Sequence, residues 1–566
     1  MGPLHSISGR PLARPLAWRA ALMATALAAA PATHAQSLPS VVLEQLEISE
    51  GLAGFGGDLD PIDAFGYAVE TLGDLDGDGV PDLAVGTNLD DDGGNFTGAV
   101  WILFLNPDGT VKAEQKISAL AGGFGGTLLP GDRFGSGVAS LGDLDGDGVI
   151  DLAVGTSFAD TFGFSSGAIW ILLLNADGTV KSELEISGNT PALVGLIPFN
   201  ARFGRSLEAL GDLNGDGVTE LAVGAWKDAG GATLVLFLDS AGSVQSATKI
   251  AAGQSGLDAD VAVNLGTGIA ALGDLDGDGV RDMAVGANGA DDWRGEVWVL
   301  FLNSDGTVKQ HQRIAQDSGG FGGALDPDDL FGTSLGTLPD RDGDGAPELV
   351  VGAVWDDDGS ANAGAAWILA LEPDGRVDSW QKISETSGGF SGGLTSSEFF
   401  GGGLAAIDTD ADGQFSLAVG AGNDNDFIGA PETGSVWVLS LNPALWREHG
   451  LELAGAGGPP RLAGSGALTA NAPTRLELSG AGAGLTAAFV LGLSALEVPF
   501  KGGAMFPFPD SISSLMLTDG LGQLSLDGAW PAGVPAGVSF FSQVWVVDPT
   551  GPFGLSASNG VSGRTP

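Results

Sequence analysis

One acidic motif occurs six times in this chain, and it constrains the fold more than any other feature. The first copy reads GDLDGDGVPDLAVG and begins at Gly73. Successive copies are 62 to 69 residues apart. Their acidic runs begin at Asp74, Asp143, Asp212, Asp274, Asp340 and Asp408. A long and steady period is typical of architectures that repeat one supersecondary unit, so we expect an array of similar units.

Each unit carries the text of four short strands. In the first unit we expect strands from Phe65 to the acidic loop, over Asp82–Val85, over Ala99–Leu105 and over Val111–Ile117. Such strands joined by tight turns form an antiparallel meander. A lone four-stranded sheet with two apolar faces is unstable, so successive sheets must pack around an axis. The sequence therefore predicts an all-β fold containing a β-propeller.

The chain ends indicate how many blades the ring has. Five of the expected third strands are followed by a segment similar in sequence to the fourth strand of the first unit. A sixth such segment, VLEQLEIS, begins near the N-terminus at Val42. The last third strand, GSVWVLSLN from Gly434, has no fourth strand after it. The simplest closure is a six-bladed propeller in which the N-terminal strand completes the last blade and hides the sheet edges. A seventh blade would need the C-terminal region, which lacks the repeat markers.

Composition shifts divide the chain into four parts. Residues 1–35 combine Arg10, Arg14 and Arg19 with an apolar run, which predicts a signal peptide cleaved near Ala35 and a secreted, cell-surface or periplasmic protein. The propeller is expected over 36–443, a glycine-, alanine- and proline-rich linker over 444–473, and a small β-sandwich over 474–566. The uncharged segment 478–496 is glycine-rich and predicts two strands rather than membrane insertion.

The charge of the chain indicates which partners it can bind, and its cysteine content indicates how its fold can be stabilised. The 566 residues carry a formal net charge of -48, which would repel nucleic acid and anionic membranes and attract cations. The chain has no cysteine, so disulfides cannot stabilise an exported fold of this length. Packing and bound ions are expected to supply that stability.

The acidic motifs set oxygen donors at alternate positions around a glycine turn. In the first copy Asp74, Asp76 and Asp78 occupy positions one, three and five, the Val80 carbonyl stands at seven, and Asp82 closes the loop at nine. Ca²⁺ takes about six to eight oxygen ligands, whereas Mg²⁺ keeps more of its waters. If the loops were only Asx-turns and bound no cation, the four carboxylates in each loop would repel one another. The sequence therefore predicts calcium sites.

Five sites are expected to be complete, and a sixth should be weaker because Ser416 replaces the carboxylate at position nine. The predicted ligands of the first three are Asp74, Asp76, Asp78, Val80, Asp82, Asp143, Asp145, Asp147, Val149, Asp151, Asp212, Asn214, Asp216, Val218 and Glu220. Those of the last three are Asp274, Asp276, Asp278, Val280, Asp282, Asp340, Asp342, Asp344, Ala346, Glu348, Asp408, Asp410 and Asp412.

A family resemblance follows from these residues. Phe-Gly pairs at Phe65, Phe134, Phe203 and Phe331 precede the DxDGDGxxD loop and a closing VGT or VGA, and this order resembles the FG-GAP repeat of integrin α-subunit propellers. The resemblance covers roughly residues 40–442 and implies a propeller with calcium between the first two strands of a blade. The fourth repeat departs from it with Leu265, and integrin propellers have seven blades. The ending FFSQVWVVDPTGPFGLSASNGV resembles a C-terminal module of secreted planctomycete-type bacterial proteins.

Function is expected to reside in the loops opposite the calcium hairpins. Variable loops and GGFGG-containing connections emerge there, which predicts a binding or adhesion module for a protein or glycan ligand. The recurring tryptophans Trp101, Trp170, Trp298, Trp367 and Trp437 predict packing between blades, and Trp293 is the better surface candidate. The chain has no catalytic motif, so we expect no enzyme. A polysaccharide-cleaving enzyme and a structural envelope protein remain the alternatives.

Overall fold

The computed structural model describes residues 41–564 except for 259–262, 342–345, 411–414, 423–432, 442–444, 450–452, 456–458, 466–467, 469–472, 502, 508, 510, 514, 532–533 and 535–537. The predicted signal peptide lies outside the described residues. The chain divides into two compact units, one of residues 40–442 and one that contains residues 443–566. None of the helices in the described part of the chain has the length and apolar character of a membrane span.

The first unit contains six four-stranded antiparallel sheets among its described residues. The first sheet comprises β2 (Phe65–Gly73), β3 (Asp82–Thr87), β4 (Ala99–Leu105) and β5 (Val111–Ser118). The next three comprise β6 (Phe134–Gly142), β7 (Asp151–Thr156), β8 (Ala168–Leu174) and β9 (Val180–Ser187); β10 (Phe203–Gly211), β11 (Glu220–Ala225), β12 (Ala232–Leu238) and β13 (Val244–Ala251); and β14 (Leu265–Gly273), β15 (Asp282–Ala287), β16 (Glu296–Leu302) and β17 (Val308–Ile314). The last two comprise β18 (Phe331–Leu338), β19 (Glu348–Ala353), β20 (Ala365–Leu371) and β21 (Val377–Ile383), and β22 (Phe400–Ile407), β23 (Ser416–Ala421), β24 (Ser435–Leu441) and β1 (Val42–Ile48).

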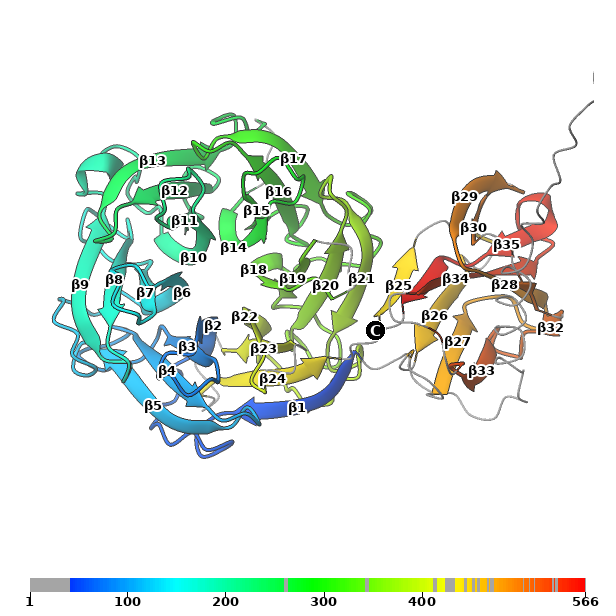
Figure 1. Ribbon diagram of the computed structural model, residues 1–566, viewed down its shortest axis with the longest axis horizontal. Helices are drawn as coiled ribbons and strands as arrows, with labels where there is room; N and C mark the ends of the chain where they lie inside the picture. Colours follow the sequence, from blue (N-terminus) through cyan, green and yellow to red (C-terminus); the bar gives the residue numbers. More distant parts are fainter. Residues whose placement is uncertain are drawn as a thin grey trace, which may run out of the picture. The chain divides into compact units, whose positions relative to one another are not determined.

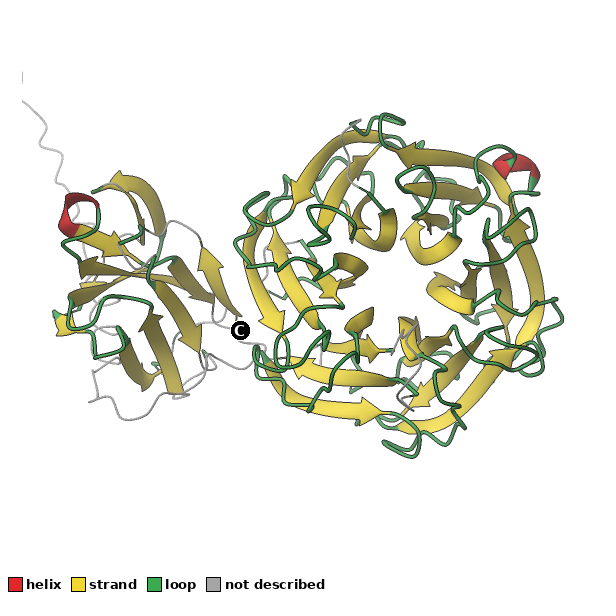
Figure 2. Ribbon diagram, turned by 180° about the vertical axis from the view of Figure 1, so that it is seen from behind, coloured by secondary structure: helices red, strands yellow, loops and turns green. Residues whose placement is uncertain are grey.

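The sheets are arranged around a central axis, with the first strand of each sheet innermost and the fourth outermost (Figure 1). Strands β3 and β4 are buried along their whole length because a neighbouring sheet covers each face. The outermost strand β5 is buried only at its ends, which explains its charged residues. Figure 2 shows strands joined by loops; the described residues of each unit also include a short helical turn, η1 (Pro191–Leu193) and η2 (Pro552–Gly554). The prediction of an all-β propeller is confirmed.

The ring is closed by its N-terminal strand. Strand β1 pairs antiparallel with β24, with Leu46 opposite Val438 and Ile48 opposite Val436. The same sheet then continues through β23 to β22, whose inner edge contacts β2 of the first sheet. Strands from both ends of this unit therefore share one sheet, as the displaced fourth-strand text predicts.

The repeated Phe-Gly pair joins neighbouring sheets. Phe65 bridges to Gly434 of the preceding sheet, and the same bridge recurs at each junction around the ring. Gly66 has a φ of +94°, and a Cβ there would lie 2.3 Å from the Ser435 carbonyl oxygen. Glycine is required because the neighbouring backbone takes the space of a side chain. Leu265 makes the same bridge to Gly231, so the fourth repeat keeps the junction without phenylalanine.

The recurring tryptophans of the third strands lie in the core, as predicted. Trp101 is 6% exposed, and its ring meets Phe55 edge to face at 5.2 Å. Phe55 belongs to the GGFGG-type connection that the sequence assigned to the recognition face, and it is 1% exposed. That assignment is wrong for the phenylalanines, because the flanking glycines let the ring turn inward onto the tryptophan. The same pairing recurs at Phe124 with Trp170, Phe321 with Trp367, and Phe390 with Trp437.

The second unit is built from two main sheets and a hairpin. One sheet has the order β25-β36-β34-β28-β31, with β32 beside β28 and β35 beside β34; the other is β26-β27-β33, and β29 pairs with β30. The strands are β25 (Leu445–His449), β26 (Arg461–Ser465), β27 (Pro473–Ser479), β28 (Thr486–Gly492), β29 (Ala495–Phe500), β30 (Gly503–Pro507), β31 (Ser511–Ile512), β32 (Met516–Leu517), β33 (Leu524–Ala529), β34 (Ser539–Val547), β35 (Leu555–Ala557) and β36 (Gly560–Arg564). Leu476 and Leu526 of one main sheet share a core with Phe489 and Val544 of the other, which makes a β-sandwich.

The segment predicted to be a linker, 444–473, instead carries β25, β26 and the first residue of β27. Strand β25 pairs antiparallel with β36, and β26 pairs antiparallel with β27. Asn559 holds this backbone, accepting from the Leu462 amide at 2.6 Å and donating to the Leu462 carbonyl at 3.0 Å. The uncharged segment 478–496 contains the end of β27, the turn 480–485, all of β28 and the start of β29, so it forms strands, as predicted.

Candidate metal centres

The acidic motif forms the hairpin between the first and second strands of each sheet. In the first sheet Asp74 accepts hydrogen bonds from the amides of Asp78, at 2.9 Å, and Gly79, at 2.8 Å. Gly77 and Gly79 have φ values of +79° and +93°, which explains the glycines at these turn positions. The backbone therefore wraps around the carboxylate at position one and turns the next acidic side chains to the same side.

The carboxylates at alternate positions lie close together. In three hairpins, ligand oxygens of three acidic residues lie within 4.8 Å of one another. The three groups are Asp74, Asp76 and Asp78; Asp143, Asp145 and Asp151; and Asp274, Asp276 and Asp282. Oxygen donors grouped at this spacing match the ligand preference of a hard divalent cation.

Predicted ligands of the third and fifth hairpins also form hydrogen bonds within their loops. In the third, the Asn214 amide donates to Asp216 at 2.9 Å and to Glu220 at 3.1 Å, which draws these predicted ligands together. In the fifth, Glu348 accepts from the Arg341 amide at 3.0 Å. The predicted ligands Asp342, Asp344 and Asp412 lie outside the described residues.

The carboxylate at position nine has a structural role that the sequence interpretation missed. Asp151 is 1% exposed, and its two oxygens accept from the Leu144 amide at 2.9 Å and the Leu174 amide at 3.0 Å. It therefore links the acidic loop to the end of the third strand. Asp82 and Asp282 make the same pair of bonds, which the repeat spacing alone does not reveal.

Burial disfavours the charged form of these position-nine groups. Desolvation, opposed by hydrogen bonds from backbone amides and reinforced by the nearby charges of Asp76 and Asp276, raises the pKa of Asp82 and of Asp282 to about 6. Desolvation likewise raises the pKa of Glu220 and Glu348 to about 7. The carboxylates of each hairpin thus repel one another when they are charged, and a bound cation would reduce this repulsion.

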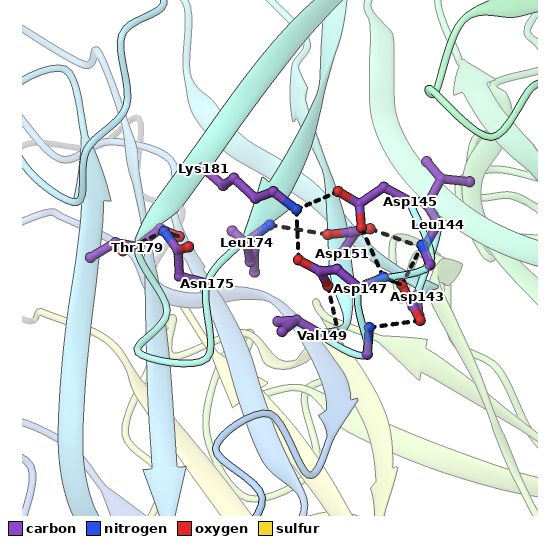
Figure 3. A network of polar contacts seen from close by, with 12 residues as sticks. Asp143, Leu144, Asp145, Asp147, Val149, Asp151, Leu174, Asn175, Thr179 and Lys181 are labelled. Carbon is purple, nitrogen blue, oxygen red and sulfur yellow. Dashed lines mark hydrogen bonds and ion pairs between the residues drawn. The ribbon is translucent and has the colours of Figure 1, made fainter.

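In three of the sheets, a lysine of the fourth strand reaches the acidic loop of the same sheet. Lys181 Nζ lies 2.5 Å from Asp145 Oδ2 and 2.6 Å from Asp147 Oδ2, and Figure 3 shows it pointing between the two carboxylates. Lys112 pairs in the same way with Asp76 and Asp78, and Lys309 with Asp276 and Asp278. The matching residue of the third sheet is Gln245, which hydrogen-bonds Asp239 instead. The hairpins therefore differ in how much of their charge an ammonium group offsets.

Ion pairs also organise loops after the second strands. Lys116 pairs with Asp90 at 2.6 Å and Asp92 at 2.9 Å, and Lys382 pairs in the same way with Asp356 and Asp358. Asp63 packs near the first of these groups. Desolvation, followed by the charge of Asp90, raises the pKa of Asp63 to about 7.

Comparisons with known proteins agree with this architecture. The FG-GAP repeat family matches residues 65–103, 134–172 and 265–300, all within the first unit. Integrin alpha-PS5 of Drosophila melanogaster is 36% identical over 166 residues, which cover 28% of this chain and 15% of that protein. Integrin alpha pat-2 of Caenorhabditis briggsae is 29% identical over 242 residues, covering 40% and 18%, and integrin alpha-5 of Xenopus laevis is 31% identical over 235 residues, covering 39% and 20%.

The chain thus spans at most a fifth of the length of these relatives. The matched segments begin at the Phe-Gly or Leu-Gly pair, include the acidic hairpin and end in the third strand. Those are the elements that carry the junction between sheets and the clustered carboxylates. The first unit therefore contains FG-GAP repeats, and its β-propeller is similar to that of the integrin α-subunits.

Proposed function

We propose that the protein is an exported binding or adhesion module whose propeller is stabilised by Ca²⁺. The observation that carries the proposal is the recurrence of clustered carboxylates at the same hairpin of the first, second and fourth sheets. Ions held at that end of the sheets would leave the loops after the second strands free for recognition. The N-terminal segment with signal-peptide character supports export.

Calcium suits the donor set better than magnesium does. The first hairpin offers Asp74, Asp76 and Asp78, the Val80 carbonyl and Asp82, all of them oxygen donors. A flexible cage of many protein oxygens is typical of Ca²⁺, whereas Mg²⁺ retains several waters. The bound ion would neutralise the hairpin, and Asp82 would carry that stabilisation to β4 through its bond with Leu105. The sixth hairpin, with Ser416 at position nine, is expected to bind more weakly.

The calcium part is tested by calorimetry on the full chain. Protein stripped with EDTA should melt at a lower temperature than protein in about 1 mM calcium, since ligands that bind only the folded state stabilise it. Titration of the stripped protein should release or absorb heat with several equivalents of calcium. Unchanged melting together with no heat of binding would contradict the proposal.

The recognition part is tested on an array of glycans and extracellular proteins, with and without chelator. Binding without turnover supports a binding module. Released sugar would instead establish a polysaccharide-cleaving enzyme, and absence of both binding and turnover would favour a structural envelope protein. A chelator should abolish binding if calcium holds the loops in place.

A further inference from the structure

The propeller contains a cavity of about 440 Å³ that the metal hairpins do not form. Its wall includes Trp226, Trp293 and Trp355, which lie in the loops after the second strands of three consecutive sheets. Tyr67 of β2 and Arg205 of β10 reach it from the inner strands. We call this cavity the aromatic pocket; its volume is within the range of about 300–1,000 Å³ that is typical of small-ligand sites.

Two of its indole rings are unusually exposed. Trp293 is 46% exposed and Trp355 is 42% exposed, whereas Trp101 and Trp367 of the core are 6% and 1% exposed. Asp291, Asp292 and Trp293 have φ values of +48°, +54° and +62° in succession. Non-glycine residues in the left-handed region are strained, and strain of this kind is concentrated at functional sites. The Trp293 carbonyl accepts from the Leu330 amide at 2.9 Å, which holds the strained turn in place.

The third tryptophan supplies a polar group to the same wall. The Nε1–H of Trp226 is buried and has no hydrogen-bond acceptor among the described residues. A buried donor without a partner costs free energy, which a ligand oxygen would recover. The pocket thus offers both aromatic faces and a donor.

Two cations at the pocket lack carboxylate partners. Lys227 rests on the Trp226 ring, with Nζ 3.9 Å from the centroid, and the Arg205 guanidinium lies 4.6 Å from the centroid of Tyr67. Neither forms an ion pair within the part of the chain that the structure describes. Six other lysines of the propeller do pair with aspartates: Lys112, Lys116, Lys181, Lys249, Lys309 and Lys382.

Lys227 is thus the exception among the described lysines of the propeller, although the chain has 71 acidic residues and only 23 lysines and arginines. A cation placed beside aromatic rings, in a chain where acidic partners are abundant, leaves a local positive charge available to an external anion. Burial and the charge of Arg202 lower the pKa of Lys227, so an arriving anion would also relieve a partly desolvated cation.

We infer that the aromatic pocket binds an acidic saccharide, a sugar chain that carries carboxylates such as uronate units. Its pyranose rings would stack on Trp293 and Trp355, and its carboxylate would pair with Lys227 and Arg205. Arginine forms strong charge-assisted bonds with carboxylates. An acidic peptide shares the charge but offers no pyranose ring whose C–H face could stack on the exposed indoles, so the sugar matches more of the wall. The inference rests on the proposed binding role of the loop face.

The test is calorimetry of the full chain in calcium with a hyaluronan tetrasaccharide, in which uronate alternates with an acetylated amino sugar. Neutral chitotetraose is the matched ligand without carboxylates. The acidic sugar should bind, and its affinity should fall as sodium chloride is raised. Lys227→Met should weaken binding at least tenfold while preserving the stem that rests on Trp226. Trp355→Ala should weaken it by a similar factor.

Arg376→Met, in the turn between β20 and β21, is the control charge removal and should leave affinity unchanged. Matching melting temperatures would show that the variants fold. Equal binding of chitotetraose, unchanged binding by Lys227→Met, or preference for an aspartate-rich peptide would each overturn the inference. If array binding persists when the acidic sugar fails to bind, the binding module stands and only the ligand class assigned to the pocket is wrong.

Discussion

Asp151 allows the structural and metal-binding roles of the acidic hairpins to be separated. Its two oxygens accept buried amides of Leu144 and Leu174, so Asp151→Ala leaves both without a partner. An unsatisfied buried group costs about 1–3 kcal/mol, which gives a gross loss of about 2–6 kcal/mol. Removing a carboxylate whose pKa is raised by burial offsets part of that loss. We expect the free energy of unfolding without calcium to fall by about 2–3 kcal/mol.

Asp145→Ala is the matched variant, because it removes a predicted ligand from the same hairpin without disturbing these amides. Its partner Lys181 is 38% exposed, and an exposed ion pair contributes only about 0–1 kcal/mol. Without calcium this variant should therefore unfold within about 1 kcal/mol of the wild type. Asp151→Asn, which keeps one acceptor, should fall between the two.

The assay is urea unfolding of the propeller followed by tryptophan fluorescence, in EDTA and in calcium. A site with a dissociation constant of about 0.1 mM contributes about 1.4 kcal/mol in about 1 mM calcium. In calcium, both variants should lose the stabilisation that this site provides. In EDTA, only Asp151→Ala should be destabilised. Equal destabilisation of Asp145→Ala and Asp151→Ala in EDTA would refute the assigned backbone role.

Three further outcomes are expected. Lys181→Met should raise calcium affinity measured by calorimetry by up to about fivefold, since an ammonium no longer competes for the carboxylates, whereas Gln245→Met should not. Burial raises the pKa of Asp63 and Asp329 to about 7, so their stabilising contribution is present below about pH 4 and is lost as the pH rises toward 7. The double asparagine variant should therefore melt above the wild type at pH 8 but not at pH 4, and parallel melting curves would contradict this. Trp367→Ala should cost about 3–5 kcal/mol in chemical unfolding, and a loss below about 1 kcal/mol would show that its ring is not a core contact.

The repeat spacing and strand patterns were sufficient to predict most of the propeller. The four strands expected between Phe65 and Ile117 agree with β2 to β5 within two residues at each end. The pairing of β1 with β24 was also predictable, because a fourth strand was missing at one end of the repeat and displaced to the other. In both cases a local pattern repeated often enough to define the unit.

Contacts between residues distant in sequence were not predictable in the same way. The inward turn of Phe55, the two amides held by Asp151 and the reach of Lys181 to Asp145 all depend on how loops and strand ends meet in space. The strands of 444–473 were missed because the glycine, alanine and proline residues around β26 are typical of a linker, and β25 (LWREH) is only five residues long. The aromatic pocket is lined by residues from several sheets and their loops, and the sequence offered Trp293 among them as a surface candidate.

The sheet shared by β1 and β24 affects how the ring is assembled. Strand β1 is the first of the ring to be synthesised, yet its partner is completed only at Leu441. Until then its backbone donors and acceptors lack their native neighbours, and an unpaired strand can join the wrong edge. Any factor that shields residues 42–48 during synthesis would favour correct closure of the ring. Cleavage of the chain just after Ile48 would make β1, the strand that closes the ring, a separate peptide that could be exchanged.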